Sequence, residues 1–90
     1  MIKDYALRSV RLENGEDAAL LYRIIAEESG GAARYGAEIV MRRGGCTERA
    51  AIRDITVSYG RIRELIALLC ENTVTPCTLR DVVEDTLNKI

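Results

Sequence analysis

The chain has 90 residues, a formal net charge of −1 and 48% hydrophobic residues, and its only aromatic residues are four tyrosines. This apolar content is ordinary for a globular protein and argues against intrinsic disorder, and the length suits one domain. A membrane protein is not expected, because no apolar run approaches the ~18 residues of a membrane span.

The first third of the chain predicts a β-hairpin. Two apolar-rich runs, residues 5–12 and 18–26, flank an Asn-Gly turn signal. A strict two-residue loop would set Glu13 opposite Glu16, and like charges facing each other are unfavourable. A longer or bulged turn is therefore favoured, and the sequence does not determine the register of this hairpin or which strand lies at the sheet edge.

A second hairpin is predicted after a loop at residues 27–31. Residues 35–42 and 47–55 form its strands, and Gly44-Gly45 suits a type I′ turn because glycine adopts positive φ angles without steric cost. With that loop, three pairs share one face: Met41 with Glu48, Ile39 with Ala50, and Ala37 with Ile52. We expect this face to be the core side. The opposite face is mostly polar, with Glu38, Val40, Arg42, Arg49, Ala51 and Arg53.

The second half of the chain predicts two helices. Thr56 or Ser58 suits the cap of the first helix, and Thr75-Pro76 suits the start of the second. Apolar residues recur at helical spacing in both. The first stripe holds Ile62, Leu65, Ile66 and Leu69, widened by Leu68 and Cys70; the second holds Leu79, Val82, Val83, Thr86, Leu87 and Ile90.

These elements predict an α+β fold in which one domain spans residues 1–90. Two β-hairpins form a four-stranded antiparallel sheet. The few residues between the helices favour a C-terminal αα-hairpin packed on one face of that sheet.

Several short segments carry a family resemblance. They are Tyr35-Gly36, Asp54-Ile55-Thr56, Val74-Thr75-Pro76, and Leu79 with Asp81-Val82-Val83-Glu84-Asp85 and Leu87. With these segments the chain resembles a family of short, uncharacterised proteins from Gram-positive, clostridia-like bacteria, classified as a domain of unknown function. The likeness covers roughly the last two-thirds of the chain. It implies a bacterial cytoplasmic origin and no particular activity.

Charge is unevenly distributed along the chain. Residues 34–63 carry seven arginines against three acidic residues, whereas the segments before and after them are net negative. A two-stranded β-ribbon can enter a DNA major groove, where arginine is the commonest base-reading residue. Contacts to nucleic acid would fall on Arg42, Arg43, Arg49 and Arg53. The opposing interpretation is that these arginines pair with nearby carboxylates. Few aromatic residues lie among them for the base stacking that a single-strand binder uses.

Catalysis has little support in the sequence. The chain has no histidine, which excludes Ser-His and Cys-His mechanisms in their ordinary form. Cys46, Cys70 and Cys77 offer three thiols, one fewer than the ligands of a structural zinc site, and their spacing shows no disulfide framework. We expect free thiols in a reducing cytoplasm, no metal or other cofactor, and no enzymatic activity.

An acidic face is predicted on the second helix, where Asp81, Glu84 and Asp85 follow i, i+3 and i+4 spacing. Such a patch is most often a solvated helix face, and partner binding is its functional alternative.

The favoured hypothesis is therefore a non-catalytic protein-interaction or regulatory module that binds a protein partner or a second copy of itself. Segregated charge steers association with complementary surfaces. The alternative is a small nucleic-acid-binding protein that uses the arginine-rich hairpin.

Overall fold

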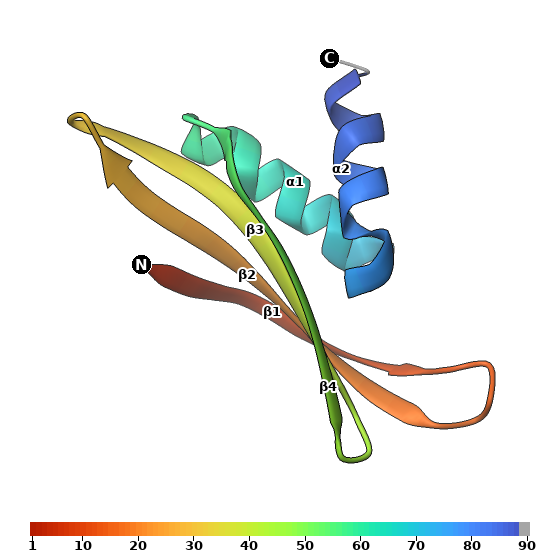
Figure 1. Ribbon diagram of the computed structural model, residues 1–90. Helices are drawn as coiled ribbons and strands as arrows, with labels where there is room; N and C mark the ends of the chain where they lie inside the picture. Colours follow the sequence, from red (N-terminus) through yellow and green to blue (C-terminus); the bar gives the residue numbers. More distant parts are fainter. Residues whose placement is uncertain (89–90) are drawn as a thin grey trace.

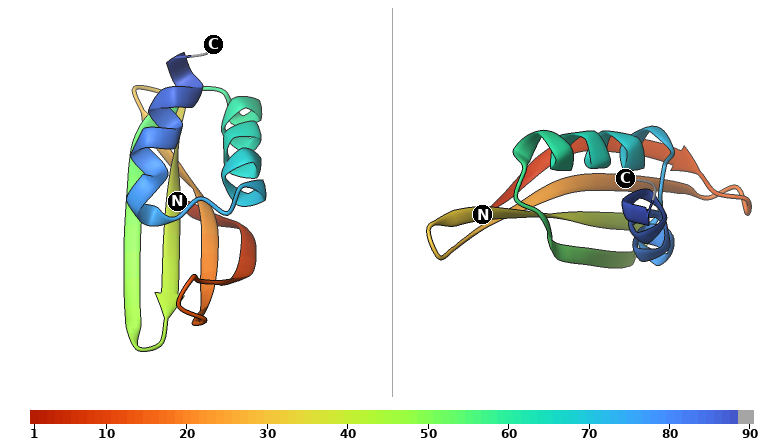
Figure 2. Two further views of the ribbon diagram at one scale, coloured as in Figure 1. Left: turned by 90° about the vertical axis from the view of Figure 1, so that its right-hand side faces the viewer. Right: turned by 90° about the horizontal axis from the view of Figure 1, so that it is seen from above.

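A computed structural model describes residues 1–88 of the chain. The strands are β1 (Ile2–Arg11), β2 (Asp17–Ser29), β3 (Ala32–Arg43) and β4 (Cys46–Thr56). They are followed by helix α1 (Tyr59–Glu71), the 3₁₀ turn η1 (Pro76–Thr78) and helix α2 (Leu79–Asn88). The strands pair antiparallel in the order β1-β2-β3-β4. Both helices pack on the same side of this sheet (Figures 1 and 2), so the predicted α+β architecture is confirmed.

The first hairpin closes through a longer loop, as predicted from the repulsion that a two-residue loop would create between Glu13 and Glu16. Arg11 pairs with Asp17, and the five intervening residues form the loop. The Leu12 amide donates to the Glu16 carbonyl at 2.8 Å, and the Asn14 side chain accepts from the Glu16 amide at 3.0 Å. The register shifts at Tyr5, between Asp4 and Ala6, which places a bulge in β1.

The second turn differs from the prediction. Residues 27–29 are the end of β2 and not part of a loop, so only Gly30 and Gly31 connect β2 to β3. Both have positive φ, 61° and 81°, as a type I′ turn requires. Glu27 and Glu28 have low strand propensity, so the sequence did not indicate that β2 extends through them. In the structure they pair with Arg34 and Ala33 of β3, and this pairing continues the strand.

The β3–β4 hairpin has the predicted register, with Ile39 opposite Ala50 and Val40 opposite Arg49. Its turn type was predicted wrongly. Gly44 has a φ of 54°, but Gly45 does not share the positive region. A type I′ turn needs positive φ at both positions, whereas positive φ at the first alone is the pattern of type II′.

A bulge interrupts the other end of this hairpin. Tyr35 pairs with Thr56 and Ala37 with Ile52, so two steps along β3 match four along β4. The backbone of β4 therefore passes very close to Gly36. A Cβ atom there would collide with the carbonyl oxygen of Ile52. Glycine at this position permits the close approach.

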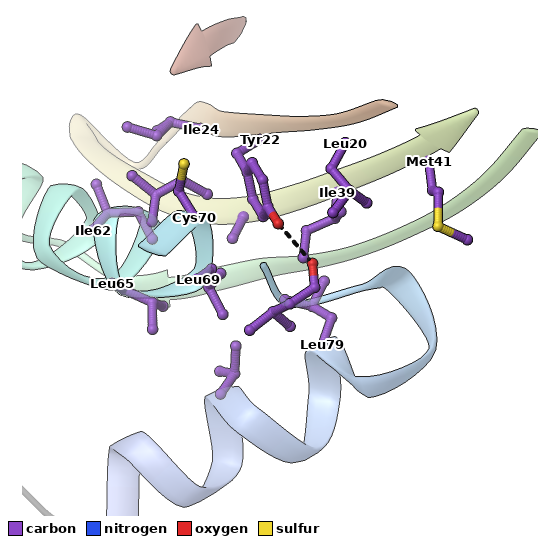
Figure 3. Close-up of a cluster of buried hydrophobic side chains, with 14 of the residues drawn as sticks. Leu20, Tyr22, Ile24, Ile39, Met41, Ile62, Leu65, Leu69, Cys70 and Leu79 are labelled. Carbon is purple, nitrogen blue, oxygen red and sulfur yellow. Dashed lines mark hydrogen bonds between the residues drawn. The ribbon is translucent and has the colours of Figure 1, made fainter. Parts of the chain in front are cut away.

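The core lies between the sheet and the helices (Figure 3). Ser58 caps α1, since its hydroxyl accepts from the Arg61 amide at 3.3 Å. The predicted stripe of α1 is buried except Leu68, which is 38% exposed. In α2, Leu79 and Val83 are buried, whereas Leu87 is 45% exposed and the predicted stripe is wrong there. Ile90 lies outside the described residues.

Tyr22 is the one tyrosine of the core and is fully buried. Its hydroxyl donates to the Val74 carbonyl at 3.0 Å, which ties β2 to the connection between the helices (Figure 3). Burial raises the pKa of Tyr22 to about 12, with the nearby Cys70 thiol adding to the effect and Arg8 opposing it. No helix within residues 1–88 has the length and apolar character to cross a membrane.

Candidate functional site

Three of the four predicted arginines lie on the sheet face that carries no helix, and we call it the open face. Side chains alternate along a strand, so the register assigns residues to it. Leu7, Leu21 and Val40 form a row across β1, β2 and β3, which Arg49 continues on β4. Leu7 is 67% exposed and Val40 only 3%. An apolar row therefore crosses the open face and is uncovered at its β1 end.

A chain of ion pairs runs beside that row. Arg23 donates to Asp4 at 2.7 Å and to Glu38 at 3.3 Å, and Arg49 lies 3.8 Å from the second Glu38 oxygen. The hydrogen bond to Asp4 is the main cause that raises the pKa of Arg23. Glu38 is buried although no helix covers it. A buried carboxylate needs such partners, and two guanidinium groups supply them.

The four predicted arginines do not converge on one point. Arg42, Arg49 and Arg53 lie on the open face, whereas Arg43 follows Arg42 in β3 and points to the other side. Arg43 pairs with Glu48 at 3.2 Å, and Arg53 pairs with Glu27 at 3.2 Å. Within residues 1–88, the Arg42 side chain forms no ion pair or hydrogen bond. Three of the four predicted arginines therefore form ion pairs with carboxylates on other strands.

The tyrosines lie away from the open face. Tyr35 and Tyr59 meet edge to face with ring centroids 5.5 Å apart. The Arg63 guanidinium lies 6.0 Å from the Tyr5 ring centre and 5.9 Å from that of Tyr59. A hollow of about 530 Å³ adjoins Tyr35 and Tyr59. Sequence reasoning missed this group, because the β1 bulge that turns Tyr5 toward α1 leaves no local signal.

The predicted acidic face of α2 is exposed. Asp81, Glu84 and Asp85 all reach solvent, and Glu84 lies 4.0 Å from Arg80 on the same helix. No group of three or more His, Cys, Asp or Glu side chains in residues 1–88 could hold a metal ion. The exposure of these carboxylates fits a solvated flank of the helix.

The three cysteines are free thiols in separate environments. Cys70 is buried in the α1 stripe, and its carbonyl accepts from Arg8 at 3.1 Å. Cys46 is exposed at the start of β4. Cys77 is exposed in η1, where its sulfur lies 3.3 Å from the Thr75 hydroxyl.

The chain belongs to a family of unknown function, DUF6514. The model of this family matches residues 1–89, so the likeness includes the first hairpin as well as the segments that suggested it. Comparisons with curated proteins and with solved structures give no match.

The segments that carried the resemblance have structural roles in this DUF6514 chain. Tyr35-Gly36 and Asp54-Ile55-Thr56 form the two sides of the β3–β4 bulge. Asp54 has a φ of 55° there, a conformation that Asp adopts more readily than most residues. Val74 and Pro76 are buried beside Tyr22 and Leu79 at the connection between the helices. These residues therefore have structural roles, whereas Asp81, Glu84 and Asp85 of the same set of segments are exposed on α2.

Proposed function

We propose that this DUF6514 protein is a non-catalytic interaction module that binds a second copy of itself through the open face of the sheet. The observation that carries the proposal is the apolar row of Leu7, Leu21 and Val40, which crosses this face and ends in an exposed leucine. Interfaces of this kind have an apolar centre surrounded by charged and polar residues.

Charge on the open face is self-complementary. The β3–β4 half carries four arginines, Arg34, Arg42, Arg49 and Arg53, against Glu38 and Asp54. The β1–β2 half carries Arg11 and Arg23 against three carboxylates, Asp4, Asp17 and Glu27. A two-fold axis parallel to the strands would stack β1 of one copy over β4 of the other. That arrangement sets the basic half against the acidic half and stacks Leu21 of one copy on Val40 of the other, with Leu7 over the aliphatic stem of Arg49.

The area of the open face gives an expectation for the affinity of the proposed dimer. Four strands about 4.8 Å apart, with roughly 30 Å of paired length, present about 600 Å² per copy. The total of about 1,200 Å² is at the lower end for stable interfaces. We therefore expect a reversible dimer with a dissociation constant in the micromolar range.

Nucleic-acid binding has weaker support from the same face. Three of its four β3–β4 arginines are held in ion pairs with carboxylates, and its rows contain no tyrosine for stacking. Phosphate contacts would have to compete with those pairs.

Light scattering coupled to size-exclusion chromatography tests the proposal at low and moderate salt, with and without mixed nucleic acid. We expect a dimer at concentrations above about 100 μM and no shift with nucleic acid, because the contact centres on an apolar row. A strict monomer at high concentration would refute self-association. A monomer that shifts with nucleic acid only at low salt would favour the arginine hairpin as a phosphate-binding surface.

A further inference from the structure

The two helices diverge from the η1 turn and leave a groove between them. Figure 1 shows α1 and α2 close together near η1 and spread apart toward the start of α1 and the end of α2. The end of β4, at Ile55 and Thr56, contributes to the lining of the gap. The groove has a volume of about 490 Å³, which lies within the range of small-molecule pockets.

The lining of this groove is mainly aliphatic. Leu65 and Leu68 contribute from α1 and Leu87 from α2, and Ile55 contributes from β4. Leu68 and Leu87 are 38% and 45% exposed, although both belong to the apolar stripes of their helices. The groove therefore holds two leucines that packing within residues 1–88 leaves half covered. An apolar ligand body would remove this surface from water.

Charge makes one end of the groove positive. Arg61 lines it in the first turn of α1, and that turn contains no acidic residue. Within residues 1–88 the Arg61 guanidinium forms no ion pair or hydrogen bond. The positive end of the helix dipole adds to this charge. Glu64 lines the same wall one turn further along, so an anion is favoured only at the Arg61 end.

We infer that this groove binds a small amphipathic monocarboxylate, an aliphatic chain of medium length that ends in one carboxylate. The chain lies between Leu68 and Leu87, over Leu65 and Ile55. The carboxylate accepts hydrogen bonds from the Arg61 guanidinium, a geometry that arginine supports in bidentate form. This site lies between the helices, on the covered side of the sheet, and does not depend on self-association through the open face.

Nitrogen-15 NMR titration of the full chain tests the inference, with decanoate, decylamine and 1-decanol as probes. We expect saturable binding of decanoate, with amide shifts centred on Ile55, Leu65, Leu68 and Leu87. Arg61→Gln should weaken decanoate binding at least tenfold. Arg42→Gln removes the same charge from an exposed arginine on the open face that forms no ion pair within residues 1–88, and it should leave the affinity unchanged. Leu87→Glu should abolish binding, and because Leu87 is exposed the fold should persist by circular dichroism.

Four results would overturn the inference. The first is the absence of saturable decanoate binding at millimolar concentration. The second is equal affinity for decanoate and decylamine, because Arg61 would then not select the head group. The third is an affinity for decanoate that Arg61→Gln leaves unchanged. Shifts confined to the open face would also contradict it, since they would assign the ligand to the other surface.

Discussion

The two faces of the sheet are built from alternating residues of the same strands, yet they are stabilised differently. Ile39 on the covered face is fully buried in the core cluster, whereas its neighbour Glu38 on the open face is buried and forms ion pairs with Arg23 and Arg49. The covered face excludes water with aliphatic side chains. The open face reaches partial burial through charged partners and retains an exposed leucine. A face that is ordered but incompletely covered is suited to binding another surface.

The largest expected difference between the faces is in core packing. Ile39→Ala should lower the free energy of unfolding by about 3 kcal/mol, because it leaves a cavity beneath the helices. Leu7→Ala on the open face should change it by less than about 0.5 kcal/mol in the monomer, because Leu7 is already solvated. Urea denaturation at low protein concentration measures both. Equal costs would show that the open face is packed as tightly as the core.

Burial of Tyr22 predicts a loss of stability at alkaline pH. The phenol has an ordinary pKa of 10.0 when the chain is unfolded and a pKa of about 12 in the fold. Its contribution is therefore complete below pH 10 and is lost as the pH rises to about 12, at a cost of about 2 to 3 kcal/mol. Denaturation of the native chain and of Tyr22→Phe across this range should give curves that converge. Parallel curves would contradict the burial of this hydroxyl.

A backbone contact at the β3–β4 bulge gives the next effect. Gly36→Ala should cost about 2 kcal/mol, because its Cβ would press on Ile52 and lie 2.8 Å from the Arg53 Cα atom. Gly45→Ala is the matched control, since no atom lies within 4 Å of a Cβ there. Thermal unfolding of both variants measures the difference. A tolerated Gly36→Ala would mean that β4 does not approach β3 so closely.

The smallest effect is expected for an exposed ion pair at the edge of the open face. Arg11 and Asp17 meet at 3.2 Å, and both side chains are about three-quarters exposed. Arg11→Ala should change stability by less than about 0.5 kcal/mol, since solvent screens such pairs. Chemical denaturation at low and high salt checks this. A cost above 1 kcal/mol would show that the open face depends on this edge.

Much of the fold was predictable from local pattern. The two-residue Gly44-Gly45 loop predicted the register of the β3–β4 hairpin, and alternation along residues 35–42 and 47–55 predicted the face that carries Arg49 and Arg53. The spacing of Ile62, Leu65, Ile66 and Leu69 predicted the buried side of α1. Both predictions are correct because apolar residues that recur every two residues in a strand, or every 3.6 residues in a helix, lie on one side of that element.

The features that were not predicted depend on contacts between distant residues, which the spacing of residues in the sequence does not indicate. The pairing of Arg53 with Glu27 joins residues 26 positions apart, through a strand that extends past its apolar run. The exposure of Leu87 follows from the divergence of the helices, which a helical stripe cannot indicate. The sequence therefore predicted which residues of β3 and β4 share the open face, but not that Leu7 and Leu21 join Val40 in one row, because that depends on the register of the first hairpin.

Sedimentation velocity of two matched variants tests the central claim most directly. Leu7→Arg places a guanidinium in the apolar row of the open face, where the proposed two-fold arrangement sets it against Arg49 of the second copy, and Leu68→Arg places one on an exposed leucine of the helix layer. Our account predicts that the native chain and Leu68→Arg form a dimer with the same dissociation constant, and that Leu7→Arg remains monomeric with an unchanged fold by circular dichroism. A Leu7→Arg variant that dimerises like the native chain would contradict the assignment of the open face as the interaction surface.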